Sequence, residues 1–328
     1  MFVDLAVTAA RRAGDESPPA PPRAAIDPAR VGLAYGLLAY GLWGVLPIYF
    51  KALAAVSPLD IVAHRILWSL LFLMALLAVT NAWDQVRAGL RHRRTMMILG
   101  ITAVLIGANW LLYVYAVTSG QILAASLGYY LNPLMNILLG RFILKERLTA
   151  LQWAAVAIAA VGVSVLAAGA GTTLWISLAL CVSFATYGLL RKVVAIDALA
   201  GLTIETAILF PVALGWLAFG FSIGTAVLGS TPVETWLLIL SGIVSTTPLL
   251  LFTAAARRLR YSTLGMLQFA APTMQFLLAV ALYGEAFTRA HAIAFAAIWV
   301  ALALYVTSLV RDLRAQRRHA AAPDLCEP

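Results

Sequence analysis

Charged residues are scarce in this chain. Asp, Glu, Lys and Arg make up 11% of its 328 residues, whereas hydrophobic residues make up 62%. A soluble domain carries roughly a quarter charged residues, and no soluble fold can hide that much apolar surface. The composition therefore excludes an ordinary soluble domain and predicts an integral membrane protein.

Several functional motifs are missing as well. The sequence has no His-Glu-x-x-His, Gly-x-Ser-x-Gly or Gly-x-x-x-x-Gly-Lys-Ser/Thr, which argues against a membrane enzyme or a nucleotide-driven pump. Cys181 lies in an expected span and Cys326 near the C-terminus, so we expect no disulfide and no metal site. The net charge of +9 is spread over loops and tails, without the basic face that nucleic-acid binding requires. We expect no catalytic activity, no cofactor and no nucleic-acid partner.

Apolar stretches of about twenty residues, the length that crosses a bilayer, recur along the chain. Residues 1–29 are rich in Pro and Ala and are expected to form a disordered tail, as residues 312–328 form a second tail. The predicted fold is all-α, with ten transmembrane helices. Hydropathy and loop residues place them at about 31–50, 58–80, 95–117, 120–143, 150–169, 173–191, 200–220, 234–256, 262–283 and 289–311.

Basic residues concentrate in one set of segments. They lie in the two tails and in every second loop, and only Lys51, Arg65 and Arg289 lie elsewhere. The positive-inside rule then places both termini in the cytoplasm.

The loop at 81–94 carries two stripes of side chains. Trp83, Val86 and Leu90 share one stripe, and arginines occupy the other. This pattern predicts a short helix that lies in the membrane interface.

The two halves of the chain repeat a pattern. Pro133, Glu146 and Thr149 recur with the same spacing as Pro272, Glu285 and Thr288. Because five spans is an odd number, the second copy must enter the membrane from the opposite side, which predicts inverted repeats at 31–169 and 172–310. Each proline is read as a helix kink, and each Glu-x-x-Thr as a cap for the following helix.

Several segments resemble a known family. They are Asn-Trp-Leu-Leu-Tyr at 109–113, Ser-Leu-Gly-Tyr-Tyr-Leu-Asn-Pro-Leu at 126–134, Lys-Glu-Arg-Leu at 145–148 and His-Arg-Ile-Leu-Trp-Ser at 64–69. These resemble the RarD-type proteins of the EamA family, in the drug/metabolite transporter superfamily; the second half matches more loosely. The resemblance implies a bacterial inner-membrane carrier with ten helices in two repeats of five.

Two charged residues lie within the expected spans. Arg65 lies about 10 Å deep, where an unpaired charge is costly. It is either a cavity-facing cation for an anionic or zwitterionic substrate, or a structural residue that is paired or snorkels to the interface. Glu205 has roughly the corresponding position in the second repeat and is a candidate for the same reason.

Polar side chains one helical turn apart suggest a polar seam between the helices, although such amides often only join neighbouring helices. His64, one turn after Asp60, is read either as part of a proton relay or as an interfacial pair. The candidate substrate-binding residues are Arg65, His64, Asn109, Tyr113, Tyr129, Asn132, Asn136, Glu205, Gln268 and Gln275.

These features predict a secondary transporter that moves a small metabolite or drug-like solute by alternating access. A membrane channel or a lipid scramblase is the alternative, and a membrane-embedded enzyme a more distant one. The expected partners are a small-molecule substrate and the lipid bilayer, and a homodimer is left open.

The orientation can be tested with a membrane-impermeant thiol reagent applied to intact cells. We expect the reagent to miss Cys326, because the charge distribution places the C-terminus inside the cell. It should label a cysteine introduced at Ser119 or at Ser230. Strong labelling of Cys326 from outside would reverse the assigned orientation.

Overall fold

The computed structural model describes residues 28–53, 55–118, 122–168, 174–224, 229, 231–282 and 289–321. Within these ranges all regular secondary structure is α-helical, which confirms the all-α class. The helices are α2 (Pro28–Ala52), α3 (Pro58–Thr80), α4 (Trp83–Arg91), α5 (Arg93–Thr118), α6 (Ile122–Phe142), α7 (Ala150–Ala167), α8 (Leu174–Val193), α9 (Ala198–Ser222), α10 (Pro232–Arg258), α11 (Tyr261–Gln268), α12 (Ala270–Ala281) and α13 (Arg289–Ala321).

Among the described residues, eight helices are long and apolar enough to cross a membrane. They do not include α6 or the α11–α12 segment, so the count of ten spans stays a prediction. The short helix expected in the loop at 81–94 is present as α4.

One expected helix is interrupted. The span expected at 262–283 divides at Phe269 into α11 and α12. Pro272 has no amide hydrogen to donate to the Gln268 carbonyl four residues earlier, which accounts for a break here. Pro133 lies inside α6, which continues past it as a single element, and the kink expected there stays a prediction.

Helix α7 begins at a capping box. The Thr149 hydroxyl accepts from the Gln152 amide, and the Gln152 side chain accepts from the Thr149 amide. Thr149 therefore caps the helix that follows it, as the Glu-x-x-Thr pattern suggested.

Glu146, by contrast, caps a helix in the other half of the chain. Its Oε1 accepts from the Tyr261 amide at 2.6 Å, and its Oε2 accepts from the Ser262 amide at 3.0 Å and the Ser262 hydroxyl at 2.6 Å. The expectation that Glu146 caps α7 is corrected, because its carboxylate satisfies the free amides at the start of α11.

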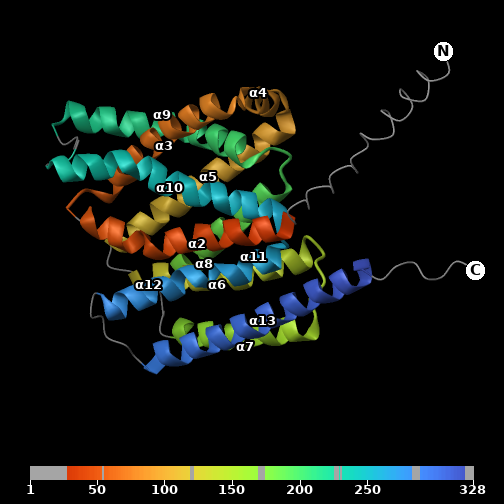
Figure 1. The fold of residues 1–328 in the computed structure, drawn as a ribbon. Coiled ribbons are helices and arrows are strands. Elements are labelled where there is room, and N and C mark those ends of the chain that lie inside the picture. The colour runs from red at the N-terminus through yellow and green to blue at the C-terminus, as the bar shows by residue number, and fades with distance from the viewer. Residues whose placement is uncertain are drawn as a thin grey trace, which may run out of the picture.

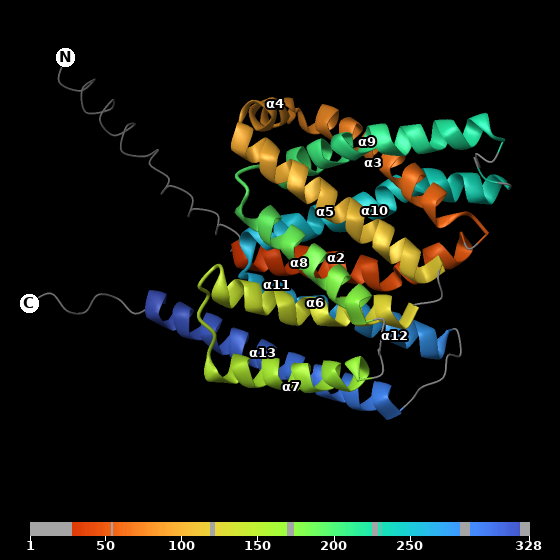
Figure 2. The ribbon, with the colours of Figure 1, turned by 180° about the vertical axis from the view of Figure 1, so that it is seen from behind.

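Figures 1 and 2 show the long helices running back and forth along one bundle, with α7 and α13 at one edge and α3 and α9 at the other. Both described ends of the chain lie at the same end of the bundle (Figure 1). The loops from α6 to α7, from α8 to α9 and from α10 to α11 lie at that end too. The basic segments therefore gather at one end.

The packing of the helices follows an exchange pattern, in which a contact between two helices recurs between their counterparts in the other half of the chain. Pairing helices by their order in the two halves matches α2 with α8, α3 with α9, α5 with α10, α6 with α11–α12, and α7 with α13. Helix α2 packs on α10 as α8 packs on α5, and α3 packs on α10 as α9 packs on α5. The pairs α3–α9, α6–α11 and α7–α13 are also in contact. Matched helices run in opposite directions along the bundle (Figures 1 and 2).

The largest core lies where α2, α8 and α10 meet. Its buried rings include Tyr40, Phe184 and Phe252, with Phe184 and Phe252 centroids 5.5 Å apart. Such aromatic pairs add to the packing energy beyond the area they bury.

Some residues named above lie outside the described part of the chain. These are Glu285, Thr288, Ser119, Ser230 and Cys326. The capping role of the second Glu-x-x-Thr and the orientation of the termini therefore stay predictions.

Helices α3 and α10 approach closely at Gly242. A Cβ atom there would lie 2.6 Å from both the Ser69 nitrogen and the Trp68 carbonyl oxygen. Since both neighbours are backbone atoms, neither can move aside without shifting α3. The Ser69 hydroxyl donates to the Gly242 carbonyl at 3.3 Å across the same contact.

We expect Gly242→Ala to destabilise the protein by about 1–3 kcal/mol, because the added methyl group overpacks this crossing. Thermal unfolding in detergent, followed by tryptophan fluorescence, measures the effect. Gly41→Ala is the matched control, since a Cβ at Gly41 meets nothing within 4 Å. Equal melting temperatures for the two variants would contradict the close contact.

Candidate functional site

Arg65 lies inside the bundle, on the third helical turn of α3. The residue is 8% exposed, and its guanidinium carbon lies 3.4 Å from the centroid of the Trp110 ring on α5. A cation over an indole face is attracted by the ring quadrupole, most strongly where water is excluded. This contact fixes the plane of the guanidinium group.

Further aromatic residues surround this pair. The Tyr113 ring lies 6.1 Å from Trp110 and 5.8 Å from Tyr129, measured between centroids. Helices α3, α5 and α6 thus contribute to one polar and aromatic cluster.

Arg65 has no acidic partner and no hydrogen bond within the described residues. Its guanidinium nitrogens do not belong to the polar atoms that are completely buried without a hydrogen-bond partner. The guanidinium group of Arg65 is therefore nearly buried, with the Trp110 ring as its neighbour.

Two amide side chains join α6 to the broken segment. Asn136 Nδ2 donates to Gln268 Oε1 at 2.7 Å, and both side chains are buried. The backbones also meet here, because a Cβ at Gly265 would lie 2.7 Å from the Pro133 carbonyl oxygen. The Asn136–Gln268 bond links the two halves of the chain beside the break at Phe269.

Asn132 differs from its neighbour one turn away. It is 0% exposed, and neither its Nδ2 nor its Oδ1 has a hydrogen-bond partner among the described residues. On α6 it lies between Gly128, which faces Ser177 of α8, and Asn136, which faces α11. A buried amide without a partner costs about 1–3 kcal/mol.

Asn109 and His64 are also buried. Asn109 Nδ2 donates to the Leu180 carbonyl at 2.9 Å and to the Ser183 hydroxyl at 2.8 Å, so it joins α5 to α8. Asp60, which was considered as a partner of His64, accepts from the Trp216 indole nitrogen at 3.0 Å. The side chain of Gln275 lies outside the described part of the structure.

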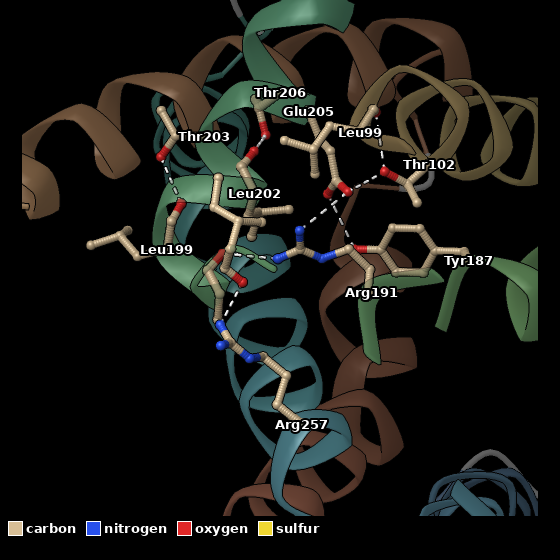
Figure 3. A network of polar contacts seen from close by, with 12 residues as sticks. Leu99, Thr102, Tyr187, Arg191, Leu199, Leu202, Thr203, Glu205, Thr206 and Arg257 are labelled. Carbon is tan, nitrogen blue, oxygen red and sulfur yellow. Dashed lines mark hydrogen bonds and ion pairs between the residues drawn. The ribbon is translucent and has the colours of Figure 1, made fainter. Parts of the chain in front are cut away.

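Glu205 lies in a network with Thr102, Tyr187 and Arg191 (Figure 3). The Thr102 hydroxyl donates to Oε1, and the Tyr187 hydroxyl donates to Oε2 at 3.4 Å. Arg191 Nη1 lies 3.6 Å from Oε1, and the two charged side chains are 0% and 1% exposed. The cation that accompanies Glu205 is therefore Arg191.

Gly201 leaves room for the arginine in this network. A Cβ at position 201 would lie 2.8 Å from both Cζ and Nη2 of Arg191. Arg191 Nη2 donates to the Ala198 carbonyl at 3.2 Å, while Nε and Nη1 have no hydrogen-bond partner within the described ranges. The charge is buried with fewer bonds than a guanidinium group can make.

A family model described as the EamA-like transporter family matches residues 30–168. An "Uncharacterized transporter" of Vibrio cholerae is 44% identical over 299 residues, covering 88% of this chain and 96% of that protein. Protein RarD of Escherichia coli K12 is 44% identical over 286 residues, covering 87% and 97%. The chain belongs to the EamA family, as a RarD-type member.

This membership makes the chain a multi-pass membrane transporter of the drug/metabolite superfamily. The relatives carry transporter names, which points to a protein that is not an enzyme. The fold also resembles a solved crystal structure with 23% identity and a TM-score of 0.66, covering 84% of this chain and 96% of the other.

For this EamA-family chain, the structure brings together some of the expected site residues. Arg65, Tyr113 and Tyr129 lie in one cluster, and Asn136 contacts Gln268. Glu205 belongs to the Arg191 network instead. Whether any of them touches substrate stays a prediction. Among the described residues, no group of three or more His, Cys, Asp or Glu side chains could hold a metal ion.

Sequence reasoning missed Arg191 and Trp110 as members of these clusters. Arg191 was counted with the loop cations, because hydropathy alone ends its helix there. Trp110 entered only as part of the segment at 109–113 that resembles the family, and not among the candidate site residues. The signal for Arg191 was the position of Gly201 within an apolar helix, which is informative only once the end of α8 is known to fold back against the start of α9.

The buried Arg191–Glu205 pair predicts non-additive stabilities. We expect Arg191→Leu and Glu205→Leu each to cost about 3–5 kcal/mol, because either change leaves an uncompensated charge inside the bundle. The double variant should be more stable than either single variant. Thermal unfolding of the four proteins in detergent measures this.

The exposed pair of Arg257 and Asp197, with nitrogen and oxygen 2.8 Å apart, provides the control. Arg257→Gln should change stability by no more than about 1 kcal/mol. If the costs of the two buried substitutions simply added, Arg191 and Glu205 would not be acting as a pair.

Proposed function

We propose that this protein is a secondary carrier that moves a small solute by alternating access between two inverted repeats, 31–169 and 172–310. The supporting observation is the exchange pattern of packing, with matched helices that run in opposite directions. Such repeats can take up two arrangements related by a pseudo-two-fold axis in the membrane plane, one open to each side of the membrane. In this proposal α6 and α11–α12 complete ten spans, and both termini face the cytoplasm of a bacterial inner membrane.

The proposed substrate site lies beside the pseudo-two-fold axis. A two-fold axis passes midway between each helix and its counterpart, so counterparts that are in contact lie next to the axis. The pairs α3–α9 and α6–α11 are in contact in this way. Arg65 is on α3, and the Asn136–Gln268 bond joins α6 to α11. Carriers with discontinuous helices commonly bind substrate near the break, where backbone groups are freed.

Arg65 is the proposed anchor for the substrate. A carboxylate or phosphate group could pair with the guanidinium nitrogens while Trp110 covers the opposite face. Glu205 already has Arg191 beside it, so it is a poor candidate to neutralise Arg65. We therefore propose an anionic or zwitterionic solute, with Tyr113 and Tyr129 beside its apolar part.

The other candidates have smaller proposed roles. Asn132 has unused donor and acceptor capacity. Asn136 and Gln268 would have to exchange their mutual bond for bonds to the substrate. Asn109, His64 and Gln275 complete the proposed lining.

A channel or scramblase is the competing proposal, and counterflow distinguishes them. In proteoliposomes preloaded with unlabelled substrate, a carrier accelerates the entry of labelled substrate, whereas a channel does not. A ligand for this assay comes from a thermal-shift screen against a metabolite library, since a ligand that binds the folded state raises the melting temperature.

We expect Arg65→Gln to weaken binding of the ligand found in that screen about 10- to 100-fold, the effect of losing a charge-assisted hydrogen bond. The free energy of unfolding without ligand should fall by no more than about 2 kcal/mol, because Arg65 loses its contact with Trp110 but has no ion pair among the described residues. Arg30→Gln, an exposed arginine at the start of α2, is the control and should bind normally.

Equal binding by Arg65→Gln and wild type would remove Arg65 from the site. A large loss of stability in Arg65→Gln that a second change, Glu205→Gln, restored would instead indicate a structural ion pair.

A further inference from the structure

Helix α4 has an orientation different from that of the spans. Figures 1 and 2 both show it nearly end-on, while the neighbouring helices lie along the page. It joins the end of α3 to the start of α5. A helix that runs across the spans and connects their ends lies parallel to the membrane, at its surface.

One side of α4 is docked on the bundle. Gly89 is buried, and a Cβ there would lie 2.5 Å from the Ile196 side chain and 3.1 Å from that of Ile204. Val86, on the preceding turn, packs against the same small core. These contacts fix which sides of α4 remain uncovered.

The uncovered sides carry an apolar stripe and a basic stripe. Leu90 is 53% exposed, and it lies between the docked side and the arginines. Arg87 and Arg91 occupy the next sector, and both are exposed. Asp84, with its side chain 90% exposed, gives Arg87 a weak surface pair.

The start of α5 extends this surface. Arg93 and Arg94 are exposed, and Met97 one turn further is 61% exposed. Asp84 is the only acidic residue between positions 81 and 99. The surface thus presents four arginines and one carboxylate beside exposed apolar side chains.

We propose that Arg87, Arg91 and Arg94 form a binding site for the headgroup of an anionic phospholipid. The guanidinium groups pair with its phosphate, a geometry that arginine suits through its planar fork of donors. Leu90 and Met97 lie against the acyl chains. A soluble phosphate would leave both apolar side chains in water, so the combination fits a lipid.

The bound lipid would act on the packing beneath α4. Ile204, which contacts Gly89, directly precedes Glu205 in α9. A headgroup that holds α4 in place therefore also holds α9 at the position where Glu205 meets Arg191.

The test uses the purified full-length protein in a neutral detergent. Binding of fluorescently labelled phosphatidylglycerol is measured by thermophoresis, with labelled phosphatidylcholine in parallel. We expect the double variant Arg87→Gln/Arg91→Gln to bind phosphatidylglycerol about thirtyfold more weakly, since each arginine near an anionic surface contributes roughly fivefold. The double variant Arg30→Gln/Arg311→Gln removes the same charge from two other exposed positions, on α2 and α13, and should bind as wild type does.

Three results would overturn the proposal. One is equal weakening in the two double variants, which would mean diffuse attraction to a basic surface. Another is equally tight binding of phosphatidylcholine. The third is full competition by glycerol 3-phosphate at the concentration of the lipid, which would assign the site to a soluble phosphate.

A second variant distinguishes a loss of lipid binding from a loss of folding. Leu90→Ser should weaken binding of phosphatidylglycerol and leave the melting temperature in detergent without added lipid unchanged, because Leu90 is largely outside the core. Unchanged lipid binding by this variant would contradict the role of the apolar stripe.

Discussion

The carboxylate of Glu146 determines where the broken helix begins. The first amides of a helix have no partner within the helix, so where they are covered by protein the start of α11 requires acceptors from elsewhere in the chain. Glu146 provides two oxygens to Tyr261 and Ser262. With its start fixed, α11 meets α6 at Gly265, and Gln268 reaches Asn136 on the next turn.

The broken segment depends on side-chain hydroxyl groups for the same reason. Tyr40 of α2 donates to the Leu264 carbonyl at 3.2 Å, and Tyr130 of α6 donates to the Pro272 carbonyl at 3.3 Å. Helices on both sides thus supply hydrogen bonds to its backbone. Irregular backbone at membrane depth is tolerated where protein surrounds it in this way.

Hydropathy predicted the helices closely because it is a local property, and a bilayer requires each span to be apolar over its own length. A kink was expected at both Pro133 and Pro272, which look alike in sequence, so the sequence could not tell that the helix would divide only near Pro272, at Phe269. Glu146 was assigned to the nearest helix, although its partners lie in the other half. Arg191 became a member of a buried pair only because the end of α8 meets the first turns of α9.

The unpaired amide of Asn132 bears on protein engineering. Selection for stability alone would replace a buried asparagine that has no hydrogen-bond partner among the described residues, since an apolar side chain of similar size avoids the desolvation cost. A carrier has to balance at least two conformations, and stabilising one of them shifts the population away from the other. A substitution at position 132 that raises the melting temperature should therefore lower the transport rate. The same substitution would hold the protein in one conformation for structure determination.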